Sequence, residues 1–130
     1  MKKFKKLSIE YQAILVYFLS LAVSFLLYPL FYNIYIFKPV TIIGGLYAVY
    51  PGWFEKFFGV SMFAYFLCLP LFVFLFIGNK QKFIWLIGII IPSFIFLLNG
   101  TKHIFWAFVL SVIGWGLAKG ILIINKMFRK

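Results

Sequence analysis

Acidic residues are almost missing from this sequence: its 130 residues contain two, Glu10 and Glu55, and no Asp. Only 12% of the residues are charged, whereas a typical soluble domain has about 25%. Apolar residues make up 65% of the chain. A small water-soluble fold could not bury so much apolar surface, because it leaves a large fraction of its surface in water. The composition therefore excludes an ordinary soluble protein.

The groups that catalysis needs are also scarce. The chain has one His and one Cys, and its two acids are far apart in the sequence. No glycine-rich phosphate loop is present. A dyad of Cys68 and His103 would need two residues that the helix rise places about 15 Å apart in membrane depth. The sequence thus predicts no enzyme, no cofactor, no metal site and, with a lone cysteine, no intramolecular disulfide.

Long apolar runs are what the sequence has instead. Helices are the expected form, because a helix satisfies its own backbone hydrogen bonds in lipid. We therefore predict one all-α domain over residues 1–130, with membrane-spanning helices at about 11–32, 57–77, 83–100 and 103–124. The third span is short against the ~20 residues that cross a bilayer. Short connectors predict that the last three spans are antiparallel neighbours.

Residues 34–50, between the first two spans, do not fit a membrane-spanning helix. Their apolar run is short and is interrupted by Pro39, Gly44 and Gly45. We interpret this stretch as an irregular segment that lies in the interface or re-enters the membrane, where protein or water would satisfy its backbone.

Basic residues set the expected orientation. With both ends of the chain inside, ten of the 13 Lys and Arg lie on the cytoplasmic side, against Lys38, Lys56 and Lys102 outside. A five-span arrangement would place six inside and seven outside, so four spans are favoured. We expect a multi-pass protein of the inner (cytoplasmic) membrane that contacts the lipid bilayer and anionic headgroups on its cytoplasmic side. The bases flank apolar spans, so no nucleic-acid partner is predicted.

Small residues recur at helical spacing in two predicted spans, where they let membrane helices approach closely. The fourth span carries two such faces and the second span carries one. They are Ala107, Ser111, Gly114 and Ala118; Gly116 and Gly120, a GxxxG pair on roughly the opposite face; and Ser61, Ala64 and Cys68. Packing within the bundle is one interpretation. The other is that one face of the fourth span binds a second copy of the chain or another membrane protein.

Two polar side chains are candidates for a functional role. Glu10 precedes the first span, where a helix dipole favours an acid, and its alternative role is a coupling carboxylate for proton-driven transport. His103 lies at the outer end of the fourth span, either as an interfacial residue or as a proton-sensitive gate.

The leading functional hypothesis is a non-enzymatic accessory or assembly subunit that acts through helix–helix contacts. A small oligomeric transporter or channel is the alternative. The size and four-span layout resemble the small multidrug resistance family, and Gly120–Asn125 is similar to that family's closing segment. The resemblance implies transport coupled by a membrane-embedded Glu in the first helix, whereas residues 13–32 contain no acid. A third hypothesis is a holin-like pore former, which small size and a basic tail favour.

Overall fold

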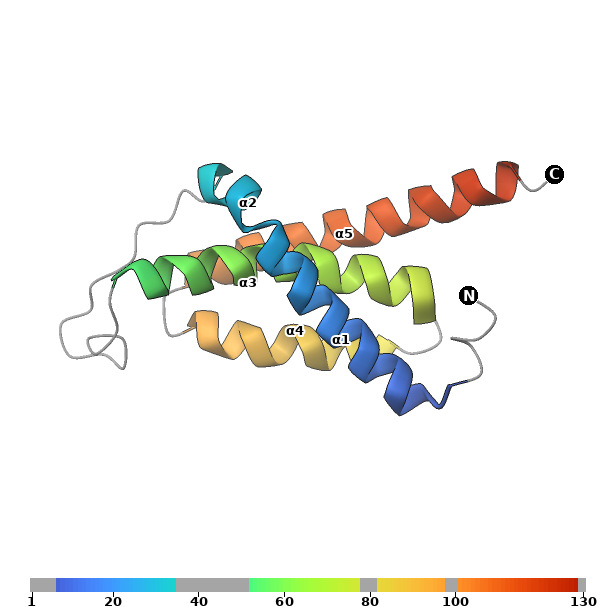
Figure 1. The fold of residues 1–130 in the computed structure, drawn as a ribbon, viewed down its shortest axis with the longest axis horizontal. Helices are drawn as coiled ribbons and strands as arrows, with labels where there is room; N and C mark the ends of the chain where they lie inside the picture. The colour runs from blue at the N-terminus through green and yellow to red at the C-terminus, as the bar shows by residue number, and fades with distance from the viewer. Residues whose placement is uncertain (1–6, 35–51, 78–81, 98–100, 129–130) are drawn as a thin grey trace.

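The computed structural model describes residues 7–34, 52–77, 82–97 and 101–128, and the predicted all-α class is confirmed (Figure 1). The described residues form five α-helices, and the third continues directly into a π-helix. In chain order the elements are α1 (Ile9–Leu26), α2 (Tyr28–Ile34), α3 (Gly52–Phe72), η3 (Val73–Ile77), α4 (Lys82–Leu97) and α5 (Thr101–Met127). The irregular segment expected at 34–50 lies, apart from Ile34, outside the described residues.

Three of the described helical stretches are long and apolar enough to cross a membrane. They are Ile9–Leu26, Lys56–Ile77 and Ile104–Met127, and a shorter apolar stretch, Phe83–Phe94, lies in α4. These stretches imply contact with a lipid bilayer and a multi-pass arrangement.

The first predicted span, 11–32, differs from the structure because it is divided between α1 and α2. The helix breaks at Leu27, whose N–H still bonds the Val23 carbonyl oxygen at 2.9 Å. Pro29 explains the break: proline has no N–H, and its ring collides with the carbonyl four residues earlier in a regular helix. The chain therefore changes direction here.

Helix α3 lies at the centre of the bundle, and α1, α2, α4 and α5 all pack against it (Figure 1). Of its apolar stretch with η3, 61% is buried, against 22% for the stretches of α1 and α5. Val60, Phe66 and Leu69 are completely buried. A helix that is apolar on all sides fits such an interior position.

The π-helix η3 extends this central helix with aromatic contacts. Phe74 is buried, and its ring centroid lies 6.0 Å from that of Trp85 in α4 and 6.3 Å from that of Trp115 in α5. These are the offset and edge-to-face distances at which aromatic pairs attract. The end of the central helix is thus fixed to both of the helices that follow it.

At Gly114, helix α5 lies directly against the backbone of α3. A Cβ atom at this position would overlap the carbonyl oxygen of Leu67 and lie 3.1 Å from its carbonyl carbon. Only glycine fits against backbone at this distance. The backbone contact sets the separation of the two helices.

This contact gives the first prediction: Gly114→Ala should lower the free energy of unfolding by about 1–3 kcal/mol, the usual cost of overpacking. Gly116→Ala is the matched control, since a Cβ at Gly116 meets nothing within 4 Å. Unfolding in mild detergent, followed by circular dichroism, measures both variants. Equal stability of the two variants would contradict the backbone contact.

Candidate functional site

The two small-residue faces of α5 have different surroundings. Ala107, Ser111, Gly114 and Ala118 are buried, as are Ser61, Ala64 and Cys68 of α3. Ala107 and Ala64 belong to one apolar cluster, so the buried face of α5 packs on α3. By contrast, Gly116 is exposed and Gly120 is partly exposed. A Cβ atom added at either glycine would meet no atom of another residue within 4 Å. The GxxxG pair has no partner within the described residues.

A side-chain hydrogen bond joins the same two helices. The Ser111 hydroxyl lies 2.8 Å from the Ala107 carbonyl oxygen and 3.2 Å from the Phe66 carbonyl oxygen of α3. Phe66 lies four residues before Pro70, which has no N–H to bond that carbonyl. Since an unsatisfied carbonyl is costly away from water, the Ser111 hydroxyl compensates for Pro70.

The second prediction follows from this compensation. Ser111→Ala should destabilise the protein by about 0.6 kcal/mol, with about 1.7 kcal/mol as the upper limit for such bonds in membranes. In a Pro70→Ala background, the restored N–H at position 70 can bond the Phe66 carbonyl. The same serine substitution should then cost less. A double-mutant cycle of unfolding free energies measures the difference; strictly additive costs would show that the serine does not act on this carbonyl.

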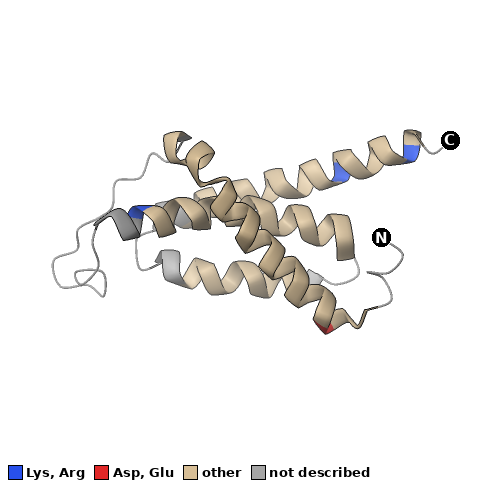
Figure 2. Ribbon diagram, viewed as in Figure 1, with Lys and Arg blue, Asp and Glu red and all other residues tan. Residues whose placement is uncertain are grey.

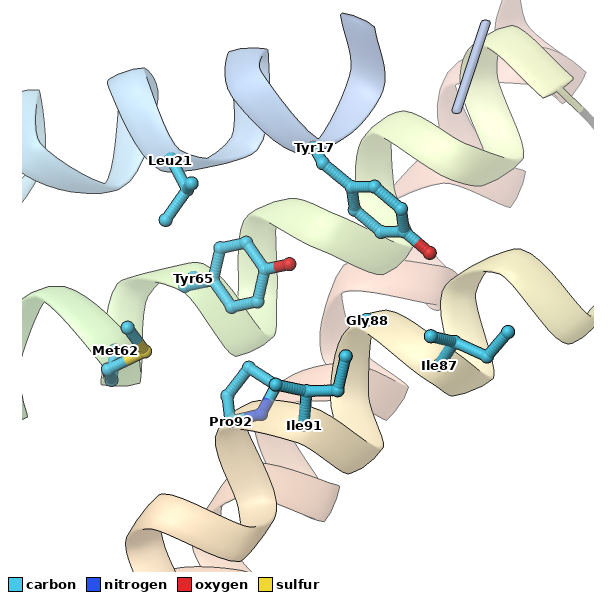
Figure 3. A pocket seen from close by; sticks show the side chains of 8 residues that line it. All are labelled: Tyr17, Leu21, Met62, Tyr65, Ile87, Gly88, Ile91 and Pro92. Atoms are coloured by element: carbon cyan, nitrogen blue, oxygen red, sulfur yellow. The ribbon is translucent and has the colours of Figure 1, made fainter. Parts of the chain in front are cut away.

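A second feature is an open cavity of about 270 Å³ between α1, α3 and α4 (Figure 3). Its lining is apolar apart from two tyrosine hydroxyls and the helix backbone. The lining residues are Tyr17 and Leu21 of α1, Met62 and Tyr65 of α3, and Ile87, Gly88, Ile91 and Pro92 of α4. Ile87 and Ile91 are exposed, so the cavity opens on the outer surface of α4.

Tyr17 forms one wall of this cavity by reaching across to α4. Its hydroxyl donates a hydrogen bond to the Ile84 carbonyl, 67 residues away in the chain. Gly88 makes room for the ring: a Cβ there would overlap Tyr17 Cε1 and lie 2.7 Å from Leu69 Cδ2. Gly88 therefore allows a tyrosine of α1 and a leucine of α3 to meet on α4.

Tyr65 closes the cavity from α3. Its residue is 5% exposed, and Figure 3 shows its hydroxyl pointing into the space between α1 and α4. Among the described residues, this hydroxyl makes no hydrogen bond. An apolar pocket with a few convergent polar groups is the usual form of a small-molecule site.

Neither Glu10 nor His103 is among the residues that line the cavity. Glu10 is exposed in the first turn of α1. His103 lies in the first turn of α5, but its side chain is outside the described residues. Within the described part of the chain, no three His, Cys, Asp or Glu residues come together as metal ligands would.

Sequence reasoning found the small-residue faces but missed the cavity. The sequence signal for the cavity was the presence of Gly88 and Pro92, four residues apart, in an otherwise apolar run. Gly88 removes a side chain and Pro92 removes a backbone donor, both on one side of the helix. Neither residue shows which other helix comes to that side.

These features together define a small helical membrane protein whose contacts are made between helices. Comparison with known protein families, with curated proteins and with solved structures finds no match to this chain.

Proposed function

We propose that this chain is a non-enzymatic membrane subunit that binds another membrane helix along the exposed GxxxG face of α5. The observation that supports this proposal is the open space at Gly116 and Gly120. A surface that faces only lipid has no need of glycine, whereas two membrane helices that pack closely do. The partner is a second copy of the chain or a helix of another membrane protein.

The shape of α5 also favours a partner. Its 27 residues extend over about 40 Å at 1.5 Å per residue, and its C-terminal half projects beyond the other helices (Figure 1). Ile121, Ile123 and Ile124 are exposed there. The projecting half thus offers an apolar surface next to the glycines.

The third prediction concerns assembly. Gly116→Leu with Gly120→Leu should weaken the complex at least about tenfold, because overpacking costs roughly 1–3 kcal/mol. The measurement is native mass spectrometry of protein extracted in mild detergent from its host membrane. Ile14→Phe is the matched control, since it enlarges an exposed side chain of α1 and should leave the assembly intact.

The comparison is made between variants that are folded and not aggregated in the detergent extract. A wild-type chain that is monomeric and alone in the extract, or a complex that survives the double substitution, would contradict the proposal.

We also propose that the chain crosses the inner membrane four times, with both of its ends in the cytoplasm. Helix α4 supports the fourth span: it packs against α3 and α5 and runs opposite to them (Figure 1). Its 16 residues extend over only about 24 Å, short of the ~30 Å hydrocarbon core. The start of α1 and the end of α5 lie at the same end of the bundle (Figure 1).

Charges at the two ends agree with this orientation (Figure 2). Lys119 and Lys126 lie in the C-terminal half of α5. At the opposite end, Lys56 Nζ donates to the Tyr32 hydroxyl at 2.8 Å and lies 3.9 Å from the centroid of that ring. Tyrosine and lysine with such contacts are common anchors at the membrane–water interface. Basic residues at the α5 end favour the cytoplasm on that side.

The fourth prediction tests the orientation by cysteine labelling in a Cys68→Ser background. A membrane-impermeant maleimide should label Asn33→Cys in intact cells or spheroplasts. It should label Gln81→Cys and Phe128→Cys only after the membrane is permeabilised. Labelling of Gln81→Cys from outside would overturn the four-span topology, while the other two positions report the two faces.

A further inference from the structure

We propose that the cavity between α1, α3 and α4 binds one small, neutral, apolar molecule that carries a hydroxyl group, and that the Tyr65 hydroxyl recognises it. The proposal does not depend on the helix-binding role of α5. The cavity lining comes from other helices, so either proposal can fail without the other.

The first argument is the hydrogen-bonding capacity left in the cavity. The Tyr65 hydroxyl can both donate and accept, and it has no partner among the described residues. The residue as a whole is buried, and a hydroxyl that opens on an apolar cavity loses the hydrogen bonds that water would give it. The hydroxyl points into the cavity, so a group bound there would supply the missing partner.

The second argument is a backbone acceptor on the opposite wall. In an α-helix each carbonyl points toward the residue four positions later, which for Gly88 is Pro92. Pro92 has no N–H, and no described side chain donates to the Gly88 carbonyl. Both residues line the cavity. A ligand hydroxyl that bonds to Tyr65 would therefore lie beside a helix turn whose carbonyl lacks its regular donor.

The third argument is size and charge. An apolar cavity of about 150 Å³ is enough for benzene, so about 270 Å³ accommodates a molecule near the size of a two-ring aromatic. No charged side chain lines the cavity, and an unpaired charge at membrane depth is costly. The ligand is therefore neutral. Exposed Ile87 and Ile91 at the mouth allow it to enter from the lipid.

The fifth prediction uses 1-naphthol as the probe and naphthalene as its matched analogue without the hydroxyl. The measurement is binding of radiolabelled probe to nanodiscs that contain the full-length protein, with protein-free nanodiscs subtracted for partition into lipid. We expect saturable binding of one 1-naphthol per chain. Naphthalene should bind about tenfold more weakly, the effect of a lost hydrogen bond.

Two variants separate recognition from shape. Tyr65→Phe keeps the ring and should lower 1-naphthol binding toward the level of naphthalene, without changing naphthalene binding. Ile91→Trp should fill the mouth of the cavity and abolish binding of both probes. Ile90→Trp is its control, because Ile90 is also exposed on α4 but does not line the cavity.

Three outcomes would overturn the proposal: no saturable binding to wild-type protein, equal affinity for the two probes, or unchanged 1-naphthol binding to folded Tyr65→Phe protein. Equal affinity would instead indicate an apolar slot that lipid chains occupy.

Discussion

The contact of Gly114 with the Leu67 backbone is the constraint on which the rest of the bundle depends. It brings α5 close enough to α3 for the Ser111 hydroxyl to reach the Phe66 carbonyl at 3.2 Å. That bond in turn makes Pro70 tolerable inside the central helix, since the proline leaves this carbonyl without its usual donor. The close packing of α5 on α3 is therefore also what supplies a hydrogen-bond donor to the Phe66 carbonyl. Lipid could not supply that donor, because it offers no hydrogen bonds to the backbone.

Three prolines leave backbone carbonyls without a regular donor, and the structure treats each differently. At Pro29 the helix breaks at Leu27 and the chain continues as α2. At Pro70 a serine from another helix supplies the donor. At Pro92 the helix continues, and the affected turn lies against the cavity. The missing N–H of proline is thus associated with a bend at Pro29, an interhelical hydrogen bond near Pro70 and the wall of a candidate binding site at Pro92.

Much of the fold was predictable because membrane-spanning helices can be recognised by their apolar composition. Long runs without charge predicted the all-α class and the approximate places of the long helices. The division at Leu27 and the π-helix Val73–Ile77 depend on local backbone geometry that hydropathy does not encode. The cavity could not be predicted from the sequence, because it depends on the contact between Tyr17 of α1 and Ile84 of α4, which are 67 residues apart in the chain. Periodicity gives the face of a residue but not its neighbour.

The unequal burial of the helices has a consequence for biosynthesis. Helices α1 and α5 are mostly exposed to their surroundings, whereas most of the apolar stretch of α3 is buried, and α3 contains Pro70. Because α3 is synthesised before α5, the Ser111 hydroxyl can reach the Phe66 carbonyl only after the last of the described helices has been made. The packing of α5 on α3, the most extensive contact between two helices of the bundle, is therefore the last to form as the chain is made.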